Sequence, residues 1–327
     1  MTNRRLPFYK IKNPLDFEHA ARNLFKEQYH NNKVYRSYCD LINCHPSDVL
    51  HVKDIPFLPI QFFKTHRITT FLDTPKKTFL SSSTTGQRPS KHHLINLEDY
   101  ENSFKNCFEQ FYGSITDYTV LALLPSYLER QDSSLVYMVE KLIQNSKKEQ
   151  SGFYLNEWKD LIKTLKELDE RGEKTLLLGV SFALLDLIAK EQFKLKHTLI
   201  METGGMKGRR KEMIRDALHN ELSIGFGVDK IHSEYGMTEL LSQAYSKGDG
   251  IFECPPWMKV FVRSAEDPFQ LIDFGRSGGL NIIDLANQNS CAFIATQDLG
   301  RSFSDNRFEV LGRFDSAEIR GCNLMVL

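Results

Sequence analysis

Residues 174–201 read KTLLLGVSFALLDLIAKEQFKLKHTLIM and contain two short apolar runs separated by a segment with helical spacing. The runs Lys174–Leu178 and His197–Met201 have the length and composition of strands buried on both faces. Phe182–Lys190 between them is long enough for a helix. Because parallel strands need a crossover connection, the order strand, helix, strand predicts a parallel β-α-β unit.

The same alternation extends in both directions along the chain. Upstream, Tyr118–Leu124 predicts a strand that Pro125 ends, and Ser133–Gln144 predicts a helix. Downstream, Arg210–Leu222 predicts an amphipathic helix. Beyond residue 240, short β-like pieces separated by Gly, Asp and Asn predict a β-rich lobe. The predicted fold class is therefore α/β, with parallel β-α-β units plus a β-rich lobe.

The N-terminal quarter of the chain has a different pattern. Apolar residues recur at helical spacing over residues 14–45, and residues 54–68 (DIPFLPIQFFKTHRI) are rich in proline and aromatics. The second stretch predicts an extended segment packed against the main body. We therefore predict a helical and extended leader over residues 1–75 and a main domain over residues 76–327, with one compact domain over 1–327 as the alternative.

Composition excludes several classes of protein. The chain has 42 Lys plus Arg and 42 Asp plus Glu, so its net charge gives no whole-protein reason to bind nucleic acid. No apolar stretch approaches the roughly 20 residues that span a bilayer, and the N-terminus lacks the apolar run of a secretory signal. Six scattered cysteines indicate reduced thiols in a cytoplasm. Cys39, Cys44 and His45 lie close together, but their spacing is poor for zinc.

The first motif that could carry chemistry is residues 81–86, SSSTTG. Five hydroxyl residues closed by a glycine gather small donors and backbone N–H groups in one loop. Such a loop suits a polyphosphate, with Arg88 and Lys91 supplying positive charge. The spacing is not that of a P-loop, and an ordinary polar surface loop remains the alternative.

Three further motifs follow along the chain. Residues 235–239 (YGMTE) place an aromatic ring that can stack on a nucleobase close to Glu239, which can hold magnesium. Residues 296–300 (TQDLG) put Asp298 at the end of an apolar strand, where a carboxylate can accept ribose hydroxyls. Residues 312–315 (GRFD) are followed by EIRGC at 318–322. Hairpin and strand-end turns are the plain alternatives for the first two of these motifs.

In this order the four motifs resemble those of the adenylate-forming superfamily, which includes acyl-CoA synthetases, luciferases and peptide-synthetase adenylation domains. Residues 81–86 resemble its phosphate loop, 235–239 its Tyr-Gly-x-Thr-Glu motif, 296–298 its Thr-Gly-Asp motif and 312–321 its hinge segment. Residues 55–64 (IPFLPIQFFK) and 201–213 (METGGMKGRRKEM) look most like one branch. That branch is the acyl-protein synthetases of bacterial luminescence, the long-chain fatty acid–luciferin component ligases, and their non-luminous relatives.

This resemblance implies a fold and an activity. The fold is the large domain of an adenylate-forming enzyme, and we expect the usual small C-terminal domain, with its lysine, to be missing. The activity is ATP- and Mg²⁺-dependent activation of a fatty or other carboxylic acid as an acyl-adenylate. In the family the acyl group then passes to a cysteine near the C-terminus, for which Cys322 is the candidate, and on to an acyl reductase. Coenzyme A or an acyl carrier protein is the alternative acceptor.

The resemblance also assigns roles to individual residues. Thr84 and Glu239 would act at the magnesium, and Cys322 would carry the acyl group. The residues implied in nucleotide binding are Ser82, Ser83, Thr85, Gly86, Gly204, Gly205, Tyr235, Gly236, Thr238, Asp298 and Arg313. Two positions depart from the family pattern, since Ser83 and Gln297 each replace a glycine.

Residues 176–183 (LLLGVSFA) support a different class of enzyme. A strand running into Gly-x-Ser and then a helix is the layout of a hydrolase nucleophile elbow, which would make Ser181 the nucleophile of a thioesterase or esterase. Ala183 stands where a glycine is expected. The acid–histidine pairs that follow are Asp216 with His219 and Asp229 with His232. The simpler prediction is that Ser181 is the N-cap of a helix.

Three alternatives remain open. The chain could bind nucleotide without turnover, as a docking subunit for a reductase. His232 could face the acyl carboxylate, or it could be a core histidine paired with a backbone carbonyl. The charged run at residues 159–174 has acids and bases at helical spacing and predicts a solvated helix face.

Overall fold

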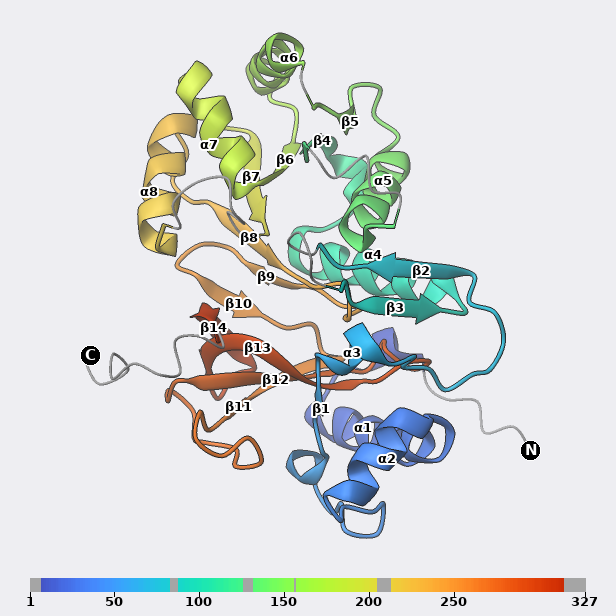
Figure 1. The fold of residues 1–327 in the computed structure, drawn as a ribbon. Coiled ribbons are helices and arrows are strands. Elements are labelled where there is room, and N and C mark those ends of the chain that lie inside the picture. Colours follow the sequence, from blue (N-terminus) through green and yellow to red (C-terminus); the bar gives the residue numbers. More distant parts are fainter. Residues whose placement is uncertain (1–6, 83–87, 126–131, 156, 205–212, 315–327) are drawn as a thin grey trace. The chain divides into compact units, whose positions relative to one another are not determined.

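The computed structural model describes residues 7–82, 88–125, 132–155, 157–204 and 213–314 (Figure 1). Contacts along the chain divide it into two compact units. The continuous unit consists of residues 75–255, and the discontinuous unit combines residues 1–74 with 256–327. The leader thus shares a unit with the C-terminal segment, while the division into a leader and a main domain stays a prediction.

The continuous unit is built on a mostly parallel sheet. Its strand order is β10-β9-β8-β7-β6-β4-β5, and β5, β4, β6, β7 and β8 run parallel while β9 is antiparallel to both of its neighbours. The strands are β4 (Thr119–Leu123), β5 (Gly152–Phe153), β6 (Thr175–Val180), β7 (Thr198–Thr203), β8 (His232–Tyr235), β9 (Ala244–Ser246) and β10 (Ile251–Glu253). Every residue of β4 and β6 is buried, as two covered faces require.

Helices flank this sheet on two sides. Figure 1 shows α7 and α8 at one side and α4 and α5 at the other. The helices are α4 (Leu97–Tyr112), α5 (Ser134–Ser146), α6 (Trp158–Glu170), α7 (Ser181–Lys190) and α8 (Arg215–Phe226), with a 3-10 turn at Ile115–Asp117. A separate antiparallel hairpin is formed by β2 (Lys77–Leu80) and β3 (Lys91–Leu94). The predicted α/β class with parallel β-α-β units is therefore confirmed.

The discontinuous unit contains the predicted β-rich lobe. Strands β11 to β14 form an antiparallel meander, and the short strand β1 joins β13 in parallel. The strands are β1 (Leu58–Pro59), β11 (Met258–Arg263), β12 (Gly278–Asp284), β13 (Phe293–Ser302) and β14 (Arg307–Arg313). The helices are α1 (Pro14–Asn31), α2 (Lys33–Leu41) and α3 (Phe62–Thr65), with 3-10 turns at Phe8–Lys10 and Val52–Asp54.

The leader packs on this lobe through aromatic rings and buried amides. The ring of Tyr35 stacks on Phe293 of β13 at a centroid distance of 5.9 Å. Gln28 Nε2 donates to Asn287 O at 2.7 Å, and Asn32 Nδ2 donates to Ser290 O at 3.0 Å. Both amide side chains are completely buried, so losing either bond would leave an unpaired polar group in the interior.

Asn32 also divides the predicted helical stretch at residues 14–45. Its extended backbone ends α1, and its side-chain oxygen accepts from Tyr35 N at 3.1 Å to begin α2. The periodic pattern continues across this residue, so it does not reveal the break. The predicted solvated helix at residues 159–174 is confirmed as α6, which buries Leu161, Leu165 and Leu168 along one face.

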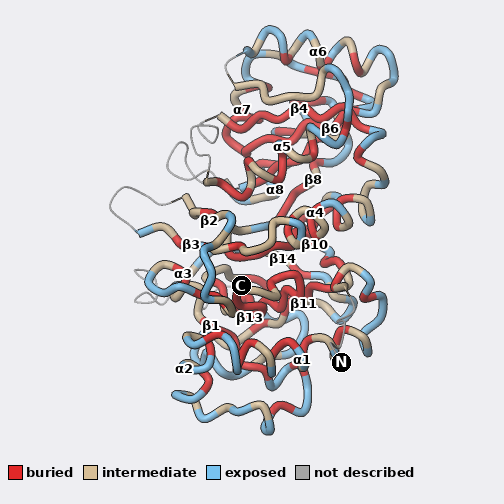
Figure 2. Tube along the Cα trace, turned by 90° about the vertical axis from the view of Figure 1, so that its right-hand side faces the viewer, coloured by how far each residue is buried: buried red, intermediate tan, exposed pale blue. Residues whose placement is uncertain are grey.

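The helices and strands differ in how deeply their residues are buried. Figure 2 shows buried residues along β4, β6, β8 and β13, and exposed residues on α2 and α6. In the part of the chain that the structure describes, no helix is long and apolar enough to cross a membrane. Over the same residues, no three His, Cys, Asp or Glu side chains gather as a metal site, and this includes the neighbourhood of Cys39, Cys44 and His45.

Candidate active site

The structure describes eight of the predicted site residues. Six lie in the continuous unit, namely Ser82, Gly204, Tyr235, Gly236, Thr238 and Glu239, and two lie in the discontinuous unit, Asp298 and Arg313. Six others lie outside the described residues: Ser83, Thr84, Thr85, Gly86, Gly205 and Cys322.

The serine-rich loop lies between the strands of the β2–β3 hairpin, and its two ends are held together. Ser81 N donates to Ser90 O at 3.1 Å, and Ser90 N donates to Ser81 Oγ at 2.9 Å. Ser82 directly follows this pair. The hairpin thus presents both ends of the loop at one place.

His92 on β3 connects this hairpin to the second predicted motif. Its Nδ1 lies 2.7 Å from Thr238 O, so Nδ1 carries the proton and donates to the carbonyl. The imidazole is buried, and burial lowers its pKa to about 4, which keeps the ring neutral. The hydrogen bond brings together two motifs that are 146 residues apart in the sequence.

The Tyr235–Glu239 segment follows β8 at the carboxyl end of the parallel strands. Gly204 follows the neighbouring strand β7, and the register pairs Thr203 with Glu234. Ligands of open α/β sheets bind at this edge. The ring of Tyr235 is buried edge-on against Phe252 at 5.7 Å, and Glu239 is only 5% exposed. Gly204, Gly236 and Glu239 therefore gather where such a sheet binds ligands.

Two buried carboxylates support these turns, and the sequence analysis missed both. Glu202 is the next-to-last residue of β7 and Glu234 is the next-to-last residue of β8; they are 6% and 8% exposed. Thr203 Oγ1 donates to Glu234 Oε2 at 2.5 Å, which ties the ends of the two strands together. For Glu202 the available signal was the apolar run directly before it, since unpaired buried acids are rare. The polar sequence HSEY at residues 232–235 contained no such signal for Glu234.

The two carboxylates differ in charge state. Burial raises the pKa of Glu234 to about 7, with the charge of Glu202 adding to the shift. Burial also opposes ionisation of Glu202, but hydrogen bonds from His219 and Ser233 and the charge of Arg215 lower its pKa overall. Glu202 is therefore ionised at neutral pH, whereas Glu234 gains and loses its proton near neutral pH.

Gly236 shows how closely Glu234 packs beneath its turn. A Cβ atom at position 236 would overlap Glu234 Oε1. The glycine is thus needed for the close approach of the carboxyl group to the backbone of the motif.

Ser181 lacks the surroundings of a hydrolase nucleophile. Its hydroxyl is buried and donates toward Glu202 Oε2 and Gly204 O, each at 3.0 Å. His219 Nε2 lies 3.6 Å from the other carboxylate oxygen of Glu202, so the acid stands between the serine and the histidine. A nucleophilic serine needs the histidine beside it as a base. The N-cap prediction for Ser181 was also wrong, because α7 begins at Ser181 itself and Val180 is the N-cap.

His232 lies at the opposite end of β8 from Gly236. Tyr112 Oη lies 3.2 Å from His232 Nδ1, and the two rings meet edge-on. Burial and the charges of Lys247 and Lys230 lower the pKa of His232 to about 4. The structure therefore gives His232 a tyrosine partner in place of the expected backbone carbonyl, and it does not bring His232 to the carboxyl end of the strand.

In the discontinuous unit, Asp298 and Arg313 lie opposite one another. They are partners across β13 and β14, and Arg313 Nε is 3.5 Å from Asp298 Oδ1. The Asp298 side chain is 14% exposed and that of Arg313 is 60% exposed. The family resemblance implied that both residues bind the nucleotide, and the structure brings them together.

Arg263 is a third residue at this place, and the sequence analysis missed it. Its guanidinium donates to Leu280 O at 2.9 Å, to Asn281 Oδ1 at 2.8 Å and to Thr296 O at 2.6 Å. A Cβ atom at Gly279 would overlap the guanidinium, so the glycine makes room for it. Arg263 thus holds the backbone of the strand that carries Thr296 and Asp298. Nothing in the sequence indicated this role, because the register of β11 and β12 sets the pairing of Arg263 with Gly279.

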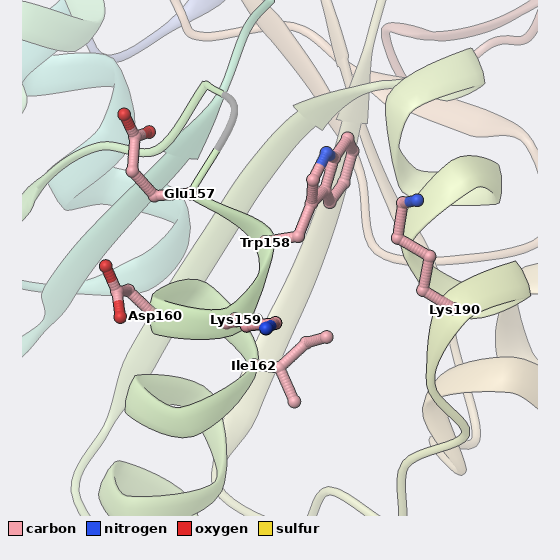
Figure 3. Close-up of a pocket in the computed structure, with 6 residues that line it drawn as sticks. All are labelled: Glu157, Trp158, Lys159, Asp160, Ile162 and Lys190. Atoms are coloured by element: carbon pink, nitrogen blue, oxygen red, sulfur yellow. The ribbon is translucent and has the colours of Figure 1, made fainter.

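A surface pocket of about 480 Å³ lies elsewhere, at the start of α6 and the end of α7. It is lined by Glu157, Trp158, Lys159, Asp160, Ile162 and Lys190, none of which is a predicted site residue. Figure 3 shows the Lys190 side chain beside the Trp158 ring, with Glu157 and Asp160 directed away from them. The Lys190 Nζ atom is 5.3 Å from the ring centroid. The pocket is therefore separate from the predicted motifs.

Solved structures define the class to which this fold belongs. ATP-bound MatB from Rhodopseudomonas palustris is 17% identical, with 72% of this chain and 47% of MatB covered, at a TM-score of 0.53. 2-Hydroxyisobutyryl-CoA ligase in the postadenylation state, in complex with 2-HIB-AMP, is 11% identical, with 92% of this chain and 68% of the ligase covered, at a TM-score of 0.68. The fold is that of the large domain of adenylate-forming ligases, as predicted. The chain spans about half the length of MatB.

The family resemblance is confirmed as well. Residues 9–99 match the family model described as "Acyl-protein synthetase, LuxE". The chain is thus similar to the LuxE acyl-protein synthetases over the leader and the serine-rich loop. No curated protein matches the chain by sequence.

Proposed function

We propose that this protein is an ATP-dependent ligase that activates a carboxylic acid as an acyl-adenylate. The observation that carries the proposal is the hydrogen bond from His92 to Thr238, because it joins the ends of the serine-rich loop to the Tyr235–Glu239 turn. The adenylate-forming fold supports it. So do the ATP in MatB and the 2-HIB-AMP in the structurally similar CoA ligase.

We assign each of the described residues its own role toward the nucleotide. In the continuous unit, Gly204 and Tyr235–Thr238 would line the adenine, while Ser82 would contact the phosphates from the β2–β3 hairpin. Asp298 would accept hydrogen bonds from the ribose hydroxyls, and Arg313 would hold the carboxylate in place.

Magnesium fits the chemistry of Glu239. A carboxylate is the hard oxygen donor that Mg²⁺ prefers, and the ion that accompanies ATP uses only one or two protein ligands beside the phosphates. Glu239 is 5% exposed at the carboxyl edge of the sheet. The second proposed ligand, Thr84, lies outside the described residues. The ion would neutralise phosphate charge.

The proposed reaction needs no nucleophile from the protein. An oxygen of the acid's carboxylate attacks the α-phosphorus, a new P–O bond forms, and the bond to the leaving pyrophosphate breaks. Such reactions are accelerated mainly by positioning and charge neutralisation. We assign positioning to the glycine turns and charge neutralisation to the backbone N–H groups and the cation.

The second half-reaction would transfer the acyl group to a thiol. We propose that the thiolate of Cys322 attacks the acyl carbon, forming a thioester and releasing AMP, before a partner such as an acyl reductase or carrier protein takes the acyl group. Cys322 lies outside the described residues, so this step rests on the family resemblance. The same resemblance favours a fatty acid as the substrate.

Exchange of labelled pyrophosphate into ATP tests the first half-reaction. The purified chain should catalyse exchange only when a carboxylic acid is present, and a panel from acetate to palmitate should show its preferred length. Absence of exchange with every acid would refute the proposed activation and favour nucleotide binding without turnover.

Acyl labelling tests the second half-reaction. Wild-type protein incubated with ATP and a labelled acid should keep the label after denaturation and lose it on treatment with hydroxylamine. Cys322→Ser should keep pyrophosphate exchange but lose the bound label, and Cys254→Ser is the matched control. Label retained in Cys322→Ser would reject this cysteine as the acceptor.

A further inference from the structure

The Gly179-Val180-Ser181 sequence is typical of a hydrolase, yet the Ser181 hydroxyl is hydrogen-bonded to a carboxylate and a backbone carbonyl. Ser181 is the first residue of α7 and is 2% exposed. Its hydroxyl lies 3.0 Å from Glu202 Oε2 and 3.0 Å from Gly204 O. Its single hydrogen is therefore shared between a carboxylate and the carbonyl of the turn that follows β7.

The carboxylate of Glu202 is itself held in place from other elements. His219 of α8 approaches Glu202 Oε1 at 3.6 Å, and Ser233 of β8 also hydrogen-bonds to the carboxylate. The Ser233 hydroxyl lies 3.3 Å from His219 Nε2, which closes the network. Ser181 is thus attached to a carboxylate that joins β7, β8 and α8.

Gly204 is the residue of this network with the widest choice of backbone conformations. Its φ of +69° lies in the left-handed region, where glycine is free to adopt several other conformations. A hydrogen bond to its carbonyl oxygen selects one of them. Because Gly204 follows β7 at the carboxyl edge of the sheet, that choice sets the orientation of the Gly204 backbone at this edge.

We propose that Ser181 is a positioning residue for nucleotide binding. Its hydroxyl, fixed by Glu202, holds the backbone of Gly204 in the conformation that forms one wall of the adenine subsite. This inference rests on the proposed function, since it takes Gly204 as part of that subsite. Ser181 then affects the affinity for the nucleotide and does not act as a nucleophile.

The test compares Ser181→Ala with a matched control. Ser146→Ala removes another buried serine hydroxyl with two partners, Ile143 O at 2.9 Å and Ser151 Oγ at 2.7 Å, at the end of α5. The dissociation constant for ATP is measured by calorimetry, KM and kcat by pyrophosphate exchange, and folding by thermal unfolding. We expect Ser181→Ala to raise Kd and KM for ATP about five- to tenfold, with kcat changed less than about threefold.

The control separates positioning from folding. Ser146→Ala should lower the unfolding temperature about as much as Ser181→Ala and leave Kd for ATP at the wild-type value. Equal Kd values in wild type and Ser181→Ala would overturn the inference, as would a loss confined to kcat. If Ser181→Ala does not fold, Ser181→Cys, which keeps a weak donor, takes its place with the same expected rise in Kd.

The outcomes also separate this inference from the proposed function. A wild-type chain that binds ATP without catalysing exchange would refute the activation, while the Kd comparison would still decide the role of Ser181. A wild-type chain that binds no ATP would overturn both. Ester hydrolysis by wild type that is lost in Ser181→Ala would overturn the positioning role in favour of a nucleophile.

Discussion

Two sets of candidate site residues, one in each unit, hold their charged groups in opposite ways. At the ends of β7 and β8, Glu202 and Glu234 are buried, and hydroxyl, imidazole and arginine groups surround them. In the β-rich lobe, the ion pair of Asp298 and Arg313 is open to solvent on the arginine side, and the half-buried Arg263 donates to the backbone of the strand that carries Asp298.

This difference follows from the type of sheet. Parallel strands covered on both faces leave no room for water at their buried ends, so a carboxylate there must be neutralised or fully hydrogen-bonded. Antiparallel strands of a lobe can expose one face, and a charge there is solvated. The stability contributed by Glu202 and Glu234 should therefore depend on pH. The stability of the β-rich lobe should depend on the hydrogen bonds that Arg263 makes to its backbone.

The largest effect is expected at Glu239. Replacement by Gln removes the proposed carboxylate ligand while keeping the shape, so pyrophosphate exchange should fall about 100- to 1,000-fold, in the range seen when electrostatic stabilisation is lost. The free energy of unfolding should change little. Glu253→Gln, an exposed position on β10, is the control. Exchange within threefold of wild type would remove Glu239 from the site.

A smaller effect, on folding, is expected at Arg263. Arg263→Met leaves Leu280 O, Thr296 O and Asn281 Oδ1 without their donor, and each unpaired buried acceptor is costly. Urea unfolding should show a loss of about 2–3 kcal/mol, and the exposed Arg276→Met should show almost none. Equal stability of the two variants would mean that the lobe does not depend on this guanidinium.

Glu234 should make the free energy of unfolding depend on pH, unlike the charged residues of the β-rich lobe. Its folded pKa of about 7 lies above the ordinary 4.5, so the folded state binds more protons between these values, and its contribution to stability is lost as pH rises from 4.5 to 7. The loss levels off above pH 7 and amounts to about 1–3 kcal/mol.

The Glu234→Gln variant isolates this contribution. His92 and His232 have lowered pKa values and act in the opposite direction, and subtracting the variant from wild type removes them. Urea unfolding at several pH values from 4.5 to 8 gives the difference in the free energy of unfolding between wild type and Glu234→Gln. This difference should become smaller toward low pH. A difference that is constant with pH would show that Glu234 keeps one charge state throughout.

The smallest effect on stability is expected at Arg313. Because its side chain is 60% exposed, Arg313→Ala should change the free energy of unfolding by less than about 0.5 kcal/mol. It should nevertheless raise KM for ATP about fivefold, an effect of about 1 kcal/mol, because Asp298 loses its partner. A large loss of stability with unchanged KM would assign the pair to folding alone.

The sequence predicted the local elements of the continuous unit well. The runs at residues 174–178 and 197–201 became β6 and β7, and α7 starts one residue before the predicted Phe182. These elements are encoded by consecutive residues, through length and apolar spacing. The pairing of Asp298 with Arg313 also fits the shared role that the family resemblance gave them.

The supporting residues could not be predicted in the same way. Glu202 and Glu234 are 32 residues apart and Arg263 reaches Thr296 across two strands, so their roles depend on strand order and register. Apolar periodicity does not encode these quantities. The contact from His92 to Thr238 likewise exists only once the hairpin docks on the sheet.

The buried amides of Gln28 and Asn32 have a consequence for how this chain is made. Their partners, Asn287, Ser290 and Ala292, are translated about 260 codons later, a delay of roughly 10–50 s at ordinary rates of synthesis. Throughout that interval the emerging leader carries unsatisfied amides and uncovered aromatic rings, while residues 75–255 can already fold. A nascent chain of this protein should therefore engage a chaperone through its earliest-made segment.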